Sequence, residues 1–191
     1  MTIEEGRTIS IEYEGVWRRK YIARSSGSRD DSTAVWWFQS SSFHIDLRVP
    51  AGEHEVQRRT GFAGRTICSD GNRCEWRPEI AFPVIEDSVD AGFVRFADHD
   101  QHTLFETGVD GSYEEEWFRV PNENMCCSRE IEADTGRVVY RMEGKKWKAE
   151  AKGRPTDNYF GHAQEPSHWT EVSVYEKNAE DNTWKLVAST L

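Results

Sequence analysis

The chain has 191 residues, with 24 Lys and Arg against 34 Asp and Glu, which gives a formal net charge of −10. This acidic balance excludes a nucleic-acid partner, because such binding depends on Lys and Arg that neutralise phosphates. No segment approaches the roughly 20 consecutive apolar residues of a membrane-spanning helix, so we predict no membrane span. The 8 Trp, 6 Tyr and 9 Phe residues are enough for a core, which argues against disorder.

The N-terminus and the cysteines both bear on location. Residues 1–7 lack the basic region and apolar stretch of a secretory signal, so we predict a cytoplasmic protein. Cys68 and Cys74 flank a turn and face each other across two predicted strands, but cytoplasmic thiols are normally reduced, so we favour free thiols. Cys126 and Cys127 are adjacent and point to opposite faces of an extended chain, which is poor geometry for zinc. We expect no metal site and no cofactor.

The dominant pattern is period-two alternation, broken by turn residues such as Asp110-Gly111, which predicts strands joined as antiparallel hairpins. Only residues 123–128 are expected to form one helical turn. In chain order, the predicted strands cover residues 15–23, 34–39, 43–49, 60–68, 74–82, 93–97, 103–107, 113–120, 129–133, 137–142, 146–151, 169–176 and 183–188.

Sequential hairpins of this kind predict an all-β protein, an antiparallel up-and-down barrel of about 10–12 strands with little helix, since closure removes unpaired strand edges. The length suits a single domain over residues 1–191. One long break, residues 153–167, has two interpretations: a lid or binding loop, or a simple crossover.

Adjacent Trp36 and Trp37 lie on one predicted strand and therefore face opposite sides, so one enters the interior and the other needs a different cover. Trp37 shares its face with Gln39. This pair is either a ligand platform, in which an amide orients a ligand beside an indole, or core packing in which Gln39 satisfies a strand end. We favour core packing.

The next strand alternates cleanly, with Asp46 and Arg48 on one face. We favour a surface or structural ion pair, worth less than about 1 kcal/mol at the surface, over a pocket in which Arg48 anchors an acidic group. The opposite face of this strand carries the apolar residues Phe43, Ile45, Leu47 and Val49. In the later strand over residues 74–82, one face is expected to carry Trp76, Ile80 and Phe82.

A third polar face carries Tyr113, Glu115, Trp117 and Arg119. It is either a charge network, which we favour slightly, or the wall of a polar pocket in which a buried carboxyl of raised pKa acts as an acid or base. No nucleophile elbow, phosphate-binding loop or dinucleotide fingerprint is present in the sequence.

Several short motifs, taken in order over residues 15 to 155, resemble uncharacterised bacterial and fungal lipocalin-like proteins. One fungal member is named for its interaction with a casein-kinase-type kinase. The resemblance implies a calycin-type β-barrel and no established catalytic activity, and Gly15-x-Trp17 is similar to the lipocalin entry motif. The motifs are Val35-x-Trp37-x-Gln39, Asp46-x-Arg48-x-Pro50, Phe62-Ala63-Gly64, Trp76 with Ile80-x-Phe82, Glu106-x-Gly108, Tyr113-x-Glu115-x-Trp117 and Gly153-Arg154-Pro155.

These observations favour a lipocalin-like protein that binds a small hydrophobic or amphipathic molecule in a barrel cavity. One alternative is an enzyme on the same scaffold, of the isomerase, decarboxylase or cyclase type, with Glu115 and Tyr113 as acid and base. Another is an interaction module with a protein partner and no ligand. The candidate ligand-binding residues are Trp37, Gln39, Asp46, Arg48, Tyr113, Glu115, Trp117 and Arg119.

Overall fold

Antiparallel strands account for most of the computed structural model, which describes residues 8–52, 58–69, 72–83, 90–97, 101–155 and 170–191. A short 3-10 helix, η1 (Ile11–Tyr13), precedes them. The strands are β1 (Gly15–Arg24), β2 (Arg29–Asp30), β3 (Ala34–Gln39), β4 (Phe43–Val49), β5 (Thr60–Ser69), β6 (Arg73–Phe82), β7 (Asp90–Phe96), β8 (Thr103–Gly108), β9 (Tyr113–Arg119), β10 (Cys126–Ile131), β11 (Val138–Glu143), β12 (Trp147–Gly153), β13 (Glu171–Lys177) and β14 (Trp184–Ser189).

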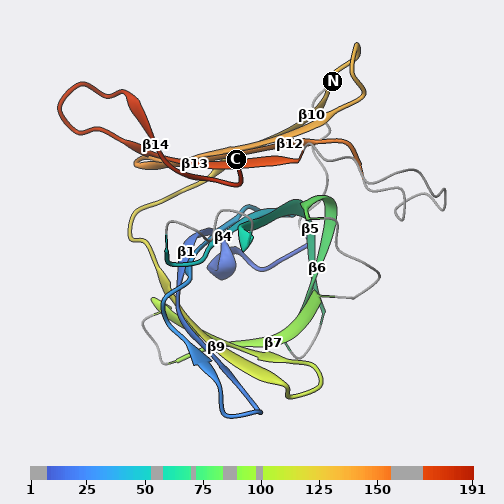
Figure 1. Ribbon diagram of the computed structural model, residues 1–191, viewed down its shortest axis with the longest axis vertical. Helices are drawn as coiled ribbons and strands as arrows, with labels where there is room; N and C mark the ends of the chain where they lie inside the picture. Colours follow the sequence, from blue (N-terminus) through green and yellow to red (C-terminus); the bar gives the residue numbers. More distant parts are fainter. Residues whose placement is uncertain (1–7, 53–57, 70–71, 84–89, 98–100, 156–169) are drawn as a thin grey trace.

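The first nine strands form a closed barrel, seen end-on in Figure 1. Each of β3 to β8 pairs with the next strand along the chain, and β1 pairs with both β3 and β9, which closes the cylinder. The two-residue strand β2 pairs only with the end of β1. The predicted antiparallel barrel is therefore confirmed. The wall consists of eight strands, β1 and β3 to β9, which is fewer than the predicted 10–12, because β10 to β14 belong to a separate sheet.

This second sheet, a five-stranded meander, lies across one side of the barrel over β4 and β5 (Figure 1). Its apolar face packs against the outer surface of the barrel, where Ile45 and Leu47 join one core with Tyr140 and Met142. The outer face of β4 is thus as dry as a protein interior, which explains why its apolar residues point away from the barrel axis.

A second core fills much of the barrel itself and contains Trp17, Trp37, Trp76 and Trp117. The prediction that adjacent indoles separate is confirmed, because Trp37 lies in the barrel and Trp36 lies under the second sheet. Both are at most 5% exposed. The alternation of β3 therefore serves two cores, one on each side of the barrel wall.

One expected face is wrong, because Trp76 and Ile80 lie in different cores. Opposite them, Gly64 pairs with Pro78 and Ala63 pairs with Ile80, so Glu79 is an extra residue in β6. A β-bulge of this kind reverses which side chains face inward. It also turns Glu79 toward the second sheet, where its carboxylate accepts hydrogen bonds from Arg129 Nε at 2.8 Å and from the Tyr140 hydroxyl.

The expected helical turn at residues 123–128 is also wrong, since β10 begins at Cys126. Glu123 acts instead as a cap for a distant turn, because its carboxylate accepts the backbone N–H of Lys146 at 2.9 Å. Among the described residues, no helix has the length and apolar character needed to cross a bilayer. Residues 156–169, which include most of the predicted lid or crossover, lie outside the described residues.

The short helix η1 closes one end of the barrel. The Trp17 indole Nε1 donates to the carbonyl of Tyr13 at 2.9 Å, and the Tyr13 ring stacks on Phe96 with ring centroids 5.2 Å apart. Arg119 lies over the Trp17 ring at 4.6 Å and donates to the carbonyl of Glu14 at 3.3 Å. This end is therefore filled, and any space for a ligand lies toward the other end.

Candidate ligand-binding site

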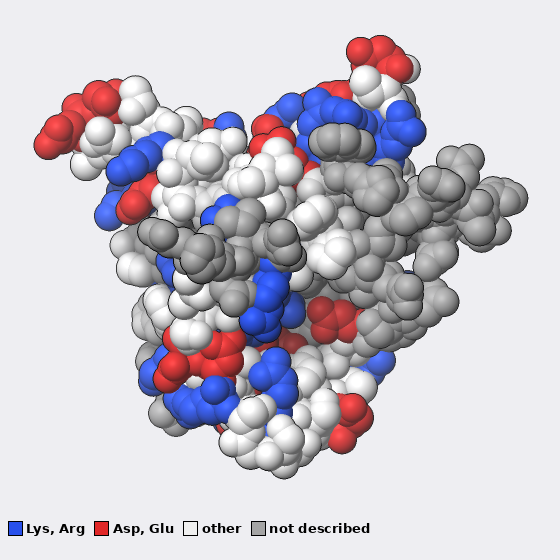
Figure 2. Space-filling view, in the orientation of Figure 1, with Lys and Arg blue, Asp and Glu red and all other residues white. Residues whose placement is uncertain are grey.

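A small cavity lies inside the barrel toward the end opposite η1, where β4 ends and β9 begins. Its volume of about 20 Å³ holds little more than one water molecule. Figure 2, which views the molecule along the barrel, shows acidic and basic side chains next to one another around a hollow. The cavity is lined by Trp37, Asp46, Arg48, Phe62, Trp76, Asp90, Glu106 and Trp117.

Trp37 is the centre of the aromatic wall. Its ring meets those of Trp76 and Trp117 edge-on, with centroids 5.7 and 5.6 Å apart, and stacks on Trp17 below at 5.9 Å. Edge-to-face contacts of this kind fix the rings more firmly than apolar burial alone. The apolar side of the cavity is therefore a rigid surface contributed by β3, β6 and β9.

The polar side begins with Arg48, which reaches in from β4. Its Nε donates to Asp46 Oδ1 at 2.8 Å, and its Nη2 lies 3.9 Å from Asp90 Oδ2. Burial raises the pKa of Asp46, whereas Arg48 lowers it. The Arg48 side chain is 34% exposed and Asp46 only 5%, so the guanidinium lies at the mouth of the cavity. The expected ion pair between Asp46 and Arg48 forms, but its placement on the surface is wrong, because this face of β4 looks into the barrel.

A second buried ion pair joins β1 to β9. Arg19 Nη1 donates to Glu115 Oε1 at 2.6 Å, and both side chains are 5% exposed. Burial raises the pKa of Glu115, while Arg48 and Arg19 lower it. Glu115 is thus a carboxylate held by the Arg19 guanidinium.

Tyr113 bonds Glu106 instead, a residue that we did not single out as part of the site. The phenol donates to Glu106 Oε1 at 2.8 Å. Burial, with the nearby charges of Glu115 and Asp90, raises the pKa of Glu106 well above its usual value. Burial and Glu106 likewise raise the pKa of Tyr113, which keeps the phenol protonated. Glu106 and Tyr113 are therefore two groups side by side whose protonated forms are favoured by burial and by the neighbouring negative charges.

The register of the sheet explains why Glu106 differs from Glu115. The two residues are directly opposite each other on β8 and β9, so their side chains share the interior face at close range. Of these two carboxylates, only Glu115 has an arginine within ion-pair distance among the described residues, whereas Glu106 has none. Two ionised carboxylates so close would repel, and the one without a cation is the one that keeps its proton.

Two glycines make room for this pair. Gly92 on β7 and Gly108 on β8 are cross-strand partners. A Cβ at Gly92 would lie 2.8 Å from Glu106 Cγ, and a Cβ at Gly108 would lie 2.6 Å from Tyr113 Cε1. The absence of a side chain at Gly92 and Gly108 therefore leaves the space that the Glu106 carboxyl and the Tyr113 ring occupy.

Trp117 contributes an unused donor. It is 2% exposed, it lines the cavity, and its indole Nε1 has no hydrogen-bond partner among the described residues. A buried donor without an acceptor costs about 1–3 kcal/mol, so such atoms are rare and call for a partner. The cavity is the adjoining space in which an acceptor can bind.

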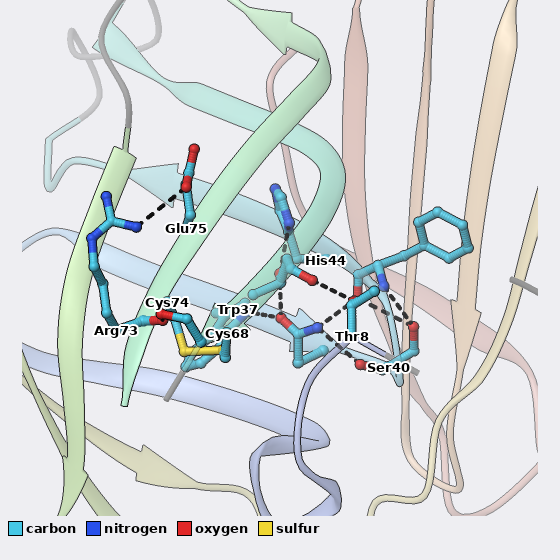
Figure 3. Close-up of a disulfide and its surroundings, with 12 residues drawn as sticks. Thr8, Trp37, Ser40, His44, Cys68, Arg73, Cys74 and Glu75 are labelled. Atoms are coloured by element: carbon cyan, nitrogen blue, oxygen red, sulfur yellow. Dashed lines mark hydrogen bonds and ion pairs between the residues drawn. A yellow bond between two sulfur atoms is a disulfide. The ribbon is translucent and has the colours of Figure 1, made fainter. Parts of the chain in front are cut away.

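Gln39 lies at the η1 end, away from the cavity, because it pairs with Gly15 at the start of β1. Figure 3 shows its neighbours Trp37, Ser40 and His44. Its Oε1 accepts from Trp37 Nε1 at 3.0 Å and from Thr66 Oγ1 at 2.8 Å, and its Nε2 donates to the carbonyls of Ser40 and Phe43. All four hydrogen-bonding positions of the amide are filled, which is the core-packing role that we favoured from the sequence.

The same close-up contains a disulfide between Cys68 and Cys74 (Figure 3). The expected free thiols are therefore wrong at these positions. The register places the two residues directly opposite each other on β5 and β6, with Cα atoms 4.0 Å apart. Because disulfides are typical of oxidising compartments, the cytoplasmic location stays a prediction. Cys126 and Cys127 are free, and no cluster of metal-ligating residues occurs in the described part of the chain.

The structure brings together six of the eight predicted residues. Trp37, Asp46, Arg48 and Trp117 line the cavity, while Tyr113 and Glu115 contact or flank the groups that line it. Gln39 and Arg119 lie at the filled end. The lining residues that we had not proposed are Phe62, Trp76, Asp90 and Glu106. Phe62, Trp76 and Glu106 do occur in the motifs of the family resemblance, which was the one signal that could have found them.

A wider groove of about 490 Å³ runs along the edge of the second sheet. It has no aromatic wall and no unused buried donor, so it is the weaker candidate. Its lining consists of Asn124, Cys126, Cys127, Ser128, Arg141, Glu143 and Gly144.

In comparisons with known proteins, no family model, no curated protein and no solved structure matches this chain. The family resemblance therefore stays a prediction, and a functional proposal rests on the geometry of the barrel.

Proposed function

We propose that this barrel binds a small, partly apolar molecule in the cavity beside Trp37. The observation that carries the proposal is the buried Trp117 indole N–H, which lines the cavity without an acceptor. Ligand pockets typically combine an apolar wall with a few polar groups that fix orientation. The three indoles supply such a wall, and Trp117 Nε1 with the Glu106 carboxyl supplies the polar groups.

The size of the cavity limits the ligand. A pocket for a drug-sized molecule measures about 300–1,000 Å³, far above the space observed here. A lipid-sized ligand is therefore not part of the proposal. The Arg48 side chain is 34% exposed at the mouth, and we expect its outward movement to enlarge the cavity when a ligand binds. A molecule of a few non-hydrogen atoms is the class that fits.

The test uses the indole N–H signals of uniformly ¹⁵N-labelled protein as reporters. Single Trp→Phe variants assign the signals, and a library of small acids, bases and uncharged molecules is added at millimolar concentration. We expect some members to shift the signals of Trp37, Trp76 and Trp117 while Trp36, under the second sheet, is unchanged. A library without any member that selectively shifts the cavity signals would overturn the proposal.

The pairing of Glu106 with Tyr113 favours one second candidate, proton transfer to a carbonyl compound. In that role a cavity carboxylate such as Asp90 removes a proton from the carbon next to the carbonyl, and Glu106 delivers a proton to the carbonyl oxygen. Deuterium incorporation from D₂O into a small ketone, followed by NMR, tests this. Exchange faster than in buffer and lost in Glu106→Gln is the expected result, and equal rates in both proteins refute it.

The protein-partner alternative has less support. The large apolar side chains exposed on the described surface are distributed over η1, β7, β9, β10, β14 and adjoining segments. They are Ile11, Phe93, Val109, Phe118, Ile131, Leu186, Val187 and Leu191. A protein partner therefore stays a prediction.

A further inference from the structure

The groups around the cavity differ in what they can still bond. Arg48 gives its Nε to Asp46, and Glu115 is held by Arg19. By contrast, Trp117 Nε1 bonds nothing among the described residues, and Glu106 uses one carboxyl oxygen to accept from Tyr113. The other oxygen of a protonated Glu106 carries an O–H. Two residues that line the cavity, Trp117 and Glu106, thus each have a hydrogen-bond donor without an acceptor in the described part of the chain.

These two donors come from neighbouring strands. Leu104 is opposite Trp117, and Glu106 is opposite Glu115, so Glu106 and Trp117 are diagonal neighbours on the interior face. Diagonal positions in an antiparallel pair lie about 7–8 Å apart, close enough for both side chains to reach one small molecule. Both residues line the same cavity, which agrees with this placement.

The charges around the cavity select against an anion, and the hydrogen-bond donors select against a cation. Arg19 and Arg48 contact four carboxylates, which leaves two negative charges in excess when Glu106 is protonated. The four are Asp30, Asp46, Asp90 and Glu115. An anion would enter a region that already holds excess negative charge. A cation would meet two donors, whose hydrogens carry positive partial charge.

We infer that the ligand is an uncharged molecule whose carbonyl-type oxygen accepts hydrogen bonds from Trp117 Nε1 and Glu106, while its apolar part lies against Trp37 and Trp76. This inference rests on the proposed function and adds the chemical class of the ligand. A neutral carboxylic acid held in an apolar site is an established way of donating a hydrogen bond to a carbonyl oxygen. Tyr113 orients the Glu106 carboxyl and is a positioning residue.

The experiment compares three planar molecules of nearly equal shape: acetamide, acetate and acetamidinium. They are neutral, anionic and cationic, so their difference in binding reports charge and hydrogen bonding with little change in size. Binding is followed by the indole N–H signals of the full chain. We expect acetamide alone to shift the Trp117 signal, with a Kd in the micromolar to millimolar range that suits so small a molecule.

Two variants with matched controls identify the donors. Trp117→Phe removes one donor and should weaken acetamide binding about three- to tenfold, observed through the Trp37 signal. Trp36→Phe is the control, because it removes an equally buried indole that also lacks a partner but lies under the second sheet. It should leave binding unchanged.

Glu106→Gln keeps an N–H donor and an acceptor for Tyr113 but cannot ionise. Binding by the wild type should fall as the pH rises and Glu106 ionises, whereas Glu106→Gln should bind equally throughout. The charged and titratable groups that face Glu106 are Asp90 on β7, Arg48 and Asp46 on β4, and Tyr113 and Glu115 on β9. All of them remain in the variant, so the difference between the two profiles belongs to Glu106.

The outcomes separate this inference from the proposed function. Preferential binding of acetate or acetamidinium, or library ligands that all lack an acceptor oxygen, overturns the inference and leaves the proposed function standing. Equal weakening by Trp117→Phe and Trp36→Phe also overturns it. The absence of any cavity ligand, in the trio and in the library, overturns both.

Discussion

The burial of His44 makes a quantitative prediction about stability and pH. The imidazole is fully buried, and its Nδ1 lies 3.0 Å from Thr66 Oγ1. Thr66 donates its only hydroxyl hydrogen to Gln39 Oε1, so Nδ1 must carry the proton and donate to Thr66. Nε2 is then the site for a second proton, and it has no partner among the described residues.

Protonation of His44 is consequently costly in the folded protein. Burial, with a smaller contribution from Arg48, lowers its pKa from 6.5 to about 3. In the unfolded chain the imidazole titrates at its ordinary value. Below that value the unfolded state binds more protons than the folded state, so stability is complete above about pH 7 and falls as the pH decreases. Between pH 7 and pH 5 the loss amounts to about 2 kcal/mol.

The perturbation is His44→Gln, whose side-chain amide can still donate to Thr66 but does not titrate. Urea unfolding at pH 7, pH 6 and pH 5 gives the unfolding free energy of each protein. The buried carboxyls titrate in both proteins and cancel in the difference. We expect the wild type to lose about 2 kcal/mol more than the variant over this interval. A difference that is constant with pH would show that His44 has the same pKa in the folded and unfolded states and would refute the reasoning.

Three further predictions follow from individual contacts. Arg129→Ala removes the cation that pairs with Glu79 and leaves that carboxylate buried between the barrel and the second sheet. Urea unfolding should therefore show a loss of about 2–4 kcal/mol in the free energy of unfolding. Gly108→Ala places a Cβ against the Tyr113 ring and should cost about 1–3 kcal/mol, with a shift of the phenol signals in NMR spectra; an unchanged protein would contradict the tight approach. Alkylation of unfolded protein without reductant should label two cysteines, and four after reduction, if Cys68 and Cys74 are bonded; four labels at once would refute the disulfide.

The strands were predictable because alternation and turn residues are local signals. Residues 34–39 and 43–49 form strands with the predicted bounds. The residues of β4 were also grouped correctly by face. What alternation does not contain is which face points inward. The usual assignment of the apolar face to the interior fails for β4, because the second sheet gives Ile45 and Leu47 a dry environment outside the barrel.

The site was harder to predict because it depends on register. Tyr113 and Glu115 share a face of β9, and their proximity in sequence suggested a pair. The pairing of β8 with β9 instead sets Glu106 opposite Glu115, while the gap at Gly108 lets Tyr113 turn toward Glu106. Likewise, the bulge at Glu79 that separates Trp76 from Ile80 arises from the pairing of β6 with β5, which no single strand reveals.

The polar interior of the barrel is itself an argument for a ligand. Buried ion pairs such as Arg19–Glu115 contribute little net stability, because desolvation offsets much of their attraction, and apolar residues of similar volume would often be at least as stable. The apolar surface that this fold needs is supplied elsewhere, between the outer face of the barrel and the second sheet. Stability therefore does not require Glu106 or an unpartnered Trp117 indole inside the barrel. An acceptor bound in the cavity gives both residues a role that packing does not.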